Sequence, residues 1–189
     1  MILGDGTLGQ MMEPVDFDSV PEAINTDKDW ATVGTGLKRE HNIINSLYLS
    51  PEELEKTIIE RQNRYNIIME NEQRYEAHDI ENADIIVTAY GTTSRVVESA
   101  VKTVRAEGLK VGVIRPITLW PFPTKIFKEA AKTAKAFLSV EMSMGQMVED
   151  VKLAVEGQAP VHFFGRTGGV IPTPQEVADE IRKIAGGLK

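Results

Sequence analysis

The chain of 189 residues contains no cysteine. This absence excludes disulfides, a thiolate nucleophile and the usual ligands of an iron–sulfur cluster. Histidine is scarce, and His41, His78 and His162 lie far apart in the sequence, without the spacing typical of a metal site. We therefore expect no metal centre built by this chain alone.

Positive charge and long apolar runs are limited as well. The formal net charge is −7, and no basic cluster stands out, which argues against a nucleic-acid partner. No apolar run approaches the length of a membrane span, and the N-terminus lacks the features of a signal peptide, so we expect a cytoplasmic protein without a membrane partner. The ordinary composition and the length predict one packed domain with an appendage.

The first part of the chain has little periodicity. Residues 13–46 include Pro14, Pro21 and the loose stretch TVGTG, which indicate an extended connection lying on a neighbouring surface. Ser50, Pro51 and Glu53 then form the pattern of a helix start with a capping box. A stripe at alternating steps of four and three then runs from Leu54 to Tyr75, interrupted by the polar residues Arg61 and Glu72. The pattern predicts one long amphipathic helix that packs on its own protein or on a partner, with a free coiled coil as the alternative.

From residue 84 onward, the sequence alternates between strand and helix patterns. The predicted strands are DIIVTAYG (84–91), KVGVI (110–114), AFLSVEM (136–142) and VHFFG (161–165). The predicted helices cover 92–108, 122–134, 145–157 and 173–187. A capping box of Thr173 and Glu176, with Pro174 between them, marks the start of the last helix. This alternation predicts an α/β domain over 80–189, a three-layer α/β/α sandwich with a mostly parallel sheet.

In such a sheet, ligands gather beyond the carboxyl ends of the strands. The first loop at this edge carries a run of small and hydroxyl residues at a helix start, Gly91, Thr92, Thr93 and Ser94. These residues are weak candidates for holding a phosphate through backbone N–H groups and hydroxyls. Plain N-capping is the simpler interpretation, because no GxGxxG motif or Walker lysine is present.

Other strand ends carry charged and aromatic side chains. Arg115, Glu141 and Arg166 are candidates for contact with a ligand or a partner subunit, with a mutual salt-bridge network as the alternative. Trp120, between ITL and PFP, is a candidate for a rigid apolar lip at a subunit contact, with core packing as the alternative. No nucleophile–base–acid set emerges from these loops, so we expect no catalytic residue in this chain.

Several segments together carry a family likeness. LGDGTLGQMMEPV, NIINSLYLSPEELE, ENEQRYE, ADIIVTAYGTTSR, VGVIRPITLWPFP and GRTGGVIPTPQE occur in this order. The chain resembles, over practically its whole length, the alpha subunit of 2-oxoacid:ferredoxin oxidoreductases, in particular the 2-oxoisovalerate (3-methyl-2-oxobutanoate) type. The resemblance implies a domain similar to the transketolase C-terminal domain. It also implies that residues 1–46 are the end of a pyrimidine-binding domain with its connection, 47–79 a helical linker and 80–189 the α/β domain.

The tripeptide Gly4-Asp5-Gly6 is open to two interpretations. Glycines permit close approach to a phosphate and a carboxylate can hold Mg²⁺, so it can be a metal and diphosphate site, or it can be a tight turn. In thiamine enzymes the metal-binding Gly-Asp-Gly is followed after roughly 25 residues by an asparagine that completes the metal shell. Asn25 and Asn42 do not fit that spacing. We therefore predict a turn.

The resemblance implies an enzyme complex that decarboxylates a 2-oxoacid oxidatively to an acyl-CoA and reduces ferredoxin. The complex would use thiamine diphosphate, Mg²⁺, iron–sulfur clusters and coenzyme A. A thiamine-diphosphate-binding beta subunit, a gamma subunit and a ferredoxin-like subunit would be partners in an oligomer. This chain would be a fragment that acts as a scaffold, binds no cofactor alone and is inactive by itself. The alternatives are a C-terminal domain of a transketolase or E1-beta type enzyme and a stand-alone nucleotide-binding module.

Overall fold

The computed structural model describes residues 1–19, 22 and 27–188. The predicted positions Pro21 and Asn25 lie outside the described residues. The chain divides into two compact units, one made of residues Met1–Met11 with Asn66–Lys189 and the other of Met12–Tyr65. The first unit contains the sheet and the predicted ligand edge.

A five-stranded sheet forms the centre of the first unit, with strand order β1-β3-β2-β4-β5. Four strands run parallel: β2 (Ile85–Thr88), β3 (Val111–Pro116), β4 (Ala136–Glu141) and β5 (Val161–Gly165). The short strand β1 (Tyr75–His78) pairs antiparallel with β3 at one edge. The predicted mostly parallel sheet is confirmed.

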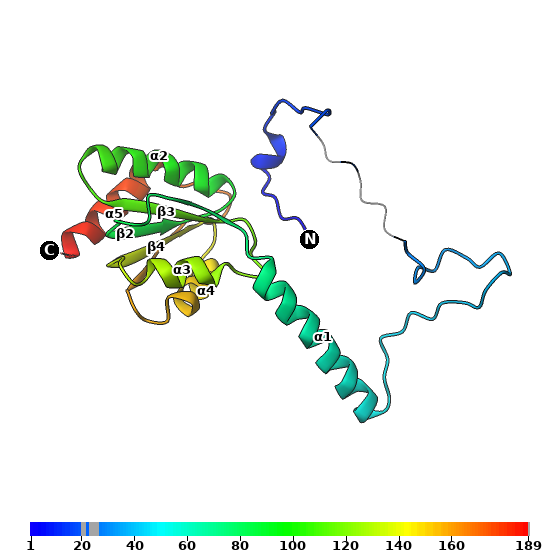
Figure 1. Cartoon of the computed structure of the whole chain (residues 1–189). Helices are drawn as coiled ribbons and strands as arrows, with labels where there is room; N and C mark the ends of the chain where they lie inside the picture. The colour runs from blue at the N-terminus through cyan, green and yellow to red at the C-terminus, as the bar shows by residue number, and fades with distance from the viewer. Residues whose placement is uncertain (20–21, 23–26, 189) are drawn as a thin grey trace. The chain divides into compact units, whose positions relative to one another are not determined.

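Helices cover both faces of the sheet, as Figure 1 shows. The helices α2 (Thr92–Ala106) and α5 (Pro174–Gly187) pack together on one face. The helices α3 (Thr124–Ala130) and α4 (Met147–Val155) pack together on the other face. The three-layer α/β/α sandwich predicted for this part of the chain is therefore confirmed, and α3 is shorter than expected.

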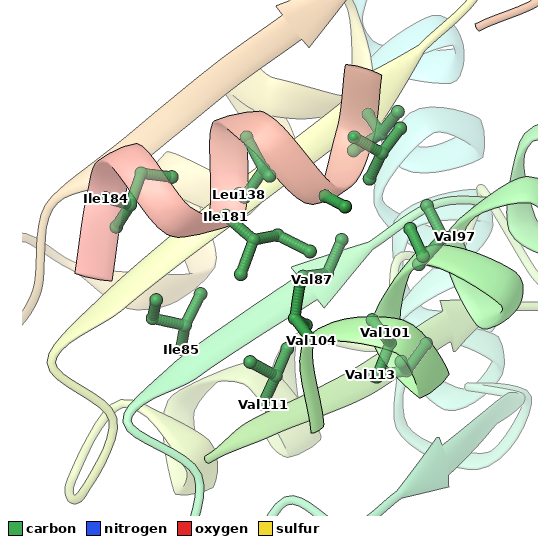
Figure 2. Packing of buried hydrophobic residues seen from close by; sticks show 14 of the residues in the cluster. Ile85, Val87, Val97, Val101, Val104, Val111, Val113, Leu138, Ile181 and Ile184 are labelled. Carbon is green, nitrogen blue, oxygen red and sulfur yellow. The ribbon is translucent and has the colours of Figure 1, made fainter. Parts of the chain in front are cut away.

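The buried side chains explain why the layers form. Ile85 and Val87 point from β2 to the α2/α5 face, while Ile86 between them points to the α3/α4 face, as alternation along a strand requires. Figure 2 shows valines of α2 and isoleucines of α5 meeting over β2 and β3. Four apolar residues at helical spacing in α2 are all buried, namely Val97, Ala100, Val101 and Val104. Burial of branched aliphatic side chains stabilises the sheet from both sides.

The long predicted helix ends earlier than its periodicity indicates. Helix α1 spans Pro51–Asn71, and the chain then forms β1, so the expectation of helix through Tyr75 is wrong. At the start of α1, Ser50 Oγ accepts the Glu53 N–H at 3.4 Å, which is one of the two bonds of a capping box, and its hydroxyl donates to Glu52. Residues 75–78 instead form backbone hydrogen bonds with β3, and these bonds could not form if the helix continued. Residues 75–78 therefore belong to the sheet and not to a helical linker.

Helix α1 is predicted to pack on its own protein or on a partner. None of its side chains is buried, although a surface helix is normally held by its apolar face. The described residues between η1 (Leu8–Gln10), a short 3-10 helix, and α1 form no helix or strand, as the composition predicts. Within the described part of the chain, no helix has the length and apolar character needed to cross a bilayer.

Gly112 shows how closely the chain packs behind the sheet edge. A Cβ atom at this position would lie 2.8 Å from the carbonyl oxygen of Asp79 and 3.0 Å from Cα of Ile80. Only glycine allows the segment after β1 to cross β3 at this distance. The crossing fixes β1 beside β3.

Candidate functional site at the carboxyl edge of the sheet

The Gly4-Asp5-Gly6 turn docks at the carboxyl edge of the sheet. Asp5 Oδ1 accepts hydrogen bonds from the backbone N–H groups of Thr7 and Leu8, both at 2.9 Å. This is the side-chain turn that aspartate forms with the residues that follow it. The motif is thus a turn that leads directly into η1.

The same carboxylate reaches across 87 positions of sequence to the start of α2. Asp5 Oδ2 accepts the Thr92 N–H at 3.1 Å, and Asp5 Oδ1 accepts the Thr92 hydroxyl at 2.9 Å. Hydrogen bonds from Leu8 and from Thr92 hold the pKa of Asp5 below its ordinary value, although partial burial acts in the opposite direction. A carboxylate therefore occupies the first turn of α2, where the helix dipole favours negative charge.

This arrangement changes the interpretation of the candidate phosphate loop. Gly91 is the N-cap of α2 with a positive φ of 61°, and it contributes no capping side chain. Thr92, Thr93 and Ser94 are buried, and the Ser94 hydroxyl donates to the Gly91 carbonyl at 2.7 Å. In this structure the donors of Thr92 serve Asp5 of the same chain.

Glu141 is a buried carboxylate at the end of β4. Its two oxygens accept hydrogen bonds from the hydroxyls of Ser139 and Ser143, both at 3.0 Å. They also accept three backbone N–H groups at the start of α4, from Gln146, Met147 and Val148, at 2.9–3.0 Å. Glu141 thus satisfies the free N–H groups of α4 and fixes the loop between β4 and that helix.

The charge of Glu141 influences two neighbouring groups. Burial, with a smaller contribution from Glu141, raises the pKa of Tyr90. Burial, together with the charges of Glu141 and Glu149, also raises the pKa of Asp150. Because both pKa values are raised, Tyr90 and Asp150 lose their protons less readily beside the charge of Glu141.

The three charged candidates at strand ends do not converge. Arg115 pairs with Glu76 of β1 at 2.8 Å, and Arg166 pairs with Glu176 of α5 at 2.7 Å. Glu141 is held by serines and backbone groups, so the alternative of a mutual salt-bridge network is wrong for the described side chains. Each cation instead joins two neighbouring elements of the fold.

Trp120 lies in the loop that follows β3. Trp120 is 58% exposed and nearby Ile117 is 52% exposed, so the alternative that Trp120 packs in the core is wrong. Phe122, two positions on, is buried against Phe127, with ring centroids 5.1 Å apart. The loop is therefore anchored by Phe122 and presents Trp120 at the surface.

A cavity of about 280 Å³ lies away from this edge, between the end of β1 and α2. His78, Lys102 and Arg105 contribute to its wall, and Arg105 forms an ion pair with Asp79 there. None of the residues proposed from the sequence for contact with a ligand or a partner lines it.

The residues at the edge do not fit a magnesium–diphosphate site. Both oxygens of Asp5 accept hydrogen bonds from the chain itself. Asn42 belongs to the other compact unit, where its amide donates to the carbonyls of Asp29 and Ala31. Among the described residues, no group of three or more His, Cys, Asp or Glu side chains is arranged to hold a metal ion. We therefore derive no chemical step through a metal or diphosphate on this chain.

Sequence reasoning missed two of these arrangements. The contact of Asp5 with Thr92 joins residues too distant for any local pattern to indicate. The role of Glu141 has a local signal, since an acidic residue shortly before a helix start is typical of N-terminal charge compensation. Its burial becomes evident only in the structure.

Comparison with known proteins identifies the class of protein to which this fold and edge belong. The family model described as "Pyruvate:ferredoxin oxidoreductase core domain II" matches residues 83–177, and the chain belongs to this family. It is similar to the ketoisovalerate oxidoreductase subunit VorB of Methanothermobacter marburgensis, with 43% identity over 186 residues, 98% of this chain and 52% of that protein. The chain thus spans about half the length of this relative.

Two further comparisons agree with this assignment. The 2-oxoglutarate synthase subunit KorA of the same organism is 42% identical over 53% of this chain and 27% of its own length. A solved 2-oxoglutarate:ferredoxin oxidoreductase from Magnetococcus marinus matches with a TM-score of 0.61 and 23% identity, covering 81% of this chain and 26% of that chain. At this identity the structural likeness supports the fold alone.

Proposed function

We propose that this chain is the domain-II portion of the alpha-type subunit of a 2-oxoacid:ferredoxin oxidoreductase that acts on 2-oxoisovalerate. The observation that carries the proposal is the similarity to ketoisovalerate oxidoreductase subunit VorB over 98% of the chain. The complex converts the 2-oxoacid and coenzyme A to an acyl-CoA and CO₂, and passes two electrons to ferredoxin. Thiamine diphosphate with Mg²⁺ supplies the carbanion chemistry and iron–sulfur clusters carry the electrons.

Within that complex, the chain serves as a scaffold. Its polar side chains at the carboxyl edge are engaged in internal contacts, as Asp5, Glu141 and Arg166 illustrate. It contains no cysteine to bind an iron–sulfur cluster, so the electrons pass through a ferredoxin-like subunit. A beta subunit holds the diphosphate, and a gamma subunit completes the assembly.

A nucleotide-binding module is a poorer account of the same edge. The backbone N–H of Thr92, which a phosphate would need, donates to Asp5 at 3.1 Å. Glycine at position 91 leaves room for the Asp5 carboxylate beside this N–H, because a Cβ atom there would lie only 3.1 Å from Asp5 Oδ2.

The function is tested on the intact complex purified under anoxic conditions. Reduction of a viologen dye is measured with 2-oxoisovalerate, 2-oxoglutarate and pyruvate as alternative substrates, each with coenzyme A. We expect the highest kcat/KM for 2-oxoisovalerate. Preference for another oxoacid would refute the substrate assignment, and absence of coenzyme A-dependent dye reduction with every oxoacid would refute the reaction class.

The contact surfaces of the scaffold are proposed to be α1 and the Trp120 loop. Apolar side chains that are largely exposed are the expected anchors of a subunit contact, and α1 carries several of them, for example Ile58, Ile59 and Ile67. Arg115, Glu141 and Arg166 act as structural supports of this edge, and Arg115 and Arg166 remain exposed enough to meet a partner.

Substitution on α1 tests this surface. We expect Ile58→Glu to leave the melting temperature of the isolated chain unchanged, because Ile58 is half exposed, and to weaken retention of partner subunits by roughly tenfold or more. Copurification and size-exclusion chromatography measure retention. The matched control is Glu60→Gln on the same helix, which should retain the partners, and full retention by Ile58→Glu would contradict the proposed surface.

A further inference from the structure

The segment Met1–Met11 belongs to the compact α/β unit, although most of its residues are exposed. Its residues are exposed except for Asp5 and Leu8, which are partly buried, and Ile2 is 98% exposed. Within the described part of the chain, the hydrogen bonds from this segment to the α/β unit are those between the Asp5 carboxylate and Thr92. The Asp5 carboxylate therefore supplies the polar part of the docking, beside the partly buried Leu8.

The start of α2 allows the Asp5 carboxylate to approach its backbone closely. Gly91 takes a positive φ of 61°, and a Cβ at this position would lie 3.1 Å from Asp5 Oδ2. The Leu8 side chain lies beside the same point, with Cδ1 at 3.8 Å. Thr92 presents both its N–H and its hydroxyl to Asp5, so the ionised form receives two hydrogen bonds from one residue.

The two carboxylate oxygens of Asp5 accept different hydrogen bonds. Oδ1 accepts the local N–H groups of Thr7 and Leu8 as well as the Thr92 hydroxyl. Oδ2 accepts the Thr92 N–H. Replacing Oδ2 by an NH₂ group therefore leaves the local turn possible and opposes only the contact with α2, because a donor would then face a donor.

We propose that the Gly4-Asp5-Gly6 turn is an intrachain latch, in which the Asp5 carboxylate on Thr92 fastens the segment Met1–Met11 to the carboxyl edge of the sheet. When the latch is closed, η1 lies at the N-terminus of α2. When it is open, the segment leaves the edge and the first turn of α2 is exposed. This role is independent of the substrate and partners of the proposed enzyme.

The absence of cysteine in the chain makes a direct test possible. A nitroxide label is attached to Ile2→Cys, and paramagnetic broadening of the backbone amides of Thr92, Thr93 and Ser94 is measured by NMR in the full chain. We expect strong broadening when Asp5 is present and its loss in Asp5→Asn. Unchanged amide signals from α5 show that the fold is intact.

Matched variants separate the latch from general effects of substitution. Asp16→Asn makes the same chemical change in a carboxylate that accepts the nearby Asp18 N–H, and broadening should persist. Thr92→Val removes the hydroxyl and should weaken broadening, whereas Thr92→Ser retains both donors and should preserve it. Broadening that persists in Asp5→Asn, or that is absent from the labelled chain with Asp5, would overturn the proposal.

Discussion

At the scale of the residue, Glu141 shows how a buried charge organises the candidate edge. Two serine hydroxyls and three backbone N–H groups surround its carboxylate, so its burial is fully compensated. We expect Glu141→Gln to lower the free energy of unfolding by about 2–4 kcal/mol, because an amide donor would face the N–H groups of α4. Urea unfolding measures the change.

A matched control for this prediction lies on α4, the helix whose N-terminus Glu141 caps. Glu149→Gln removes an exposed carboxylate that pairs with Lys152, and exposed pairs of this kind contribute about 0–1 kcal/mol. If both variants lost the same stability, the buried network of Glu141 would not be the cause.

At the scale of the element, the ion pair of Arg182 with Glu107 connects α5 to the end of α2. The guanidinium donates to both carboxylate oxygens, at 3.0 Å and 2.6 Å. The hydrogen bonds from Arg182 hold the pKa of Glu107 below its ordinary value, and the Glu107 carboxylate raises the pKa of Arg182. This pair joins the two helices of one layer.

The lowered pKa of Glu107 predicts how the stability contributed by the Arg182–Glu107 ion pair depends on pH. Because the pKa of Glu107 is lower in the folded chain, its stabilisation is fully present above the unfolded value of 4.5 and is lost as the pH falls through the folded value. We expect Glu107→Gln to be less stable than the parent chain at pH 7, with the difference vanishing in acid. Thermal unfolding across pH 3–7 measures this, and the exposed Glu81→Gln serves as the control.

At the scale of the whole molecule, the two units differ in how much they bury. The α/β unit has a continuous core on each face of its sheet, whereas no side chain of α1 is buried. In hydrogen exchange on the isolated chain, we expect amides of α1 to exchange at least about tenfold faster than those of α2 and α5. Slow exchange throughout α1 in the isolated chain would contradict this expectation, while protection gained only in the assembled complex would support α1 as a contact surface.

The sequence by itself determined the elements whose stabilisation is local. Apolar residues at helical spacing in α2 and the capping box of Thr173 with Glu176 appear in the structure as predicted, because both depend on neighbours within a few positions. The short apolar runs of β2, β3 and β4 likewise predicted buried parallel strands.

Only the tertiary structure decided the features that depend on distant partners. Tyr75-Glu76-Ala77-His78 continues the helical spacing of α1, yet pairing with β3 makes it a strand. Asp5 and Thr92 meet 87 positions apart, and Arg115 and Arg166 pair with Glu76 and Glu176 instead of with Glu141. Local periodicity carries no information on these contacts, because packing of the layers brings the groups together and the energy of each contact exists only after the chain has folded.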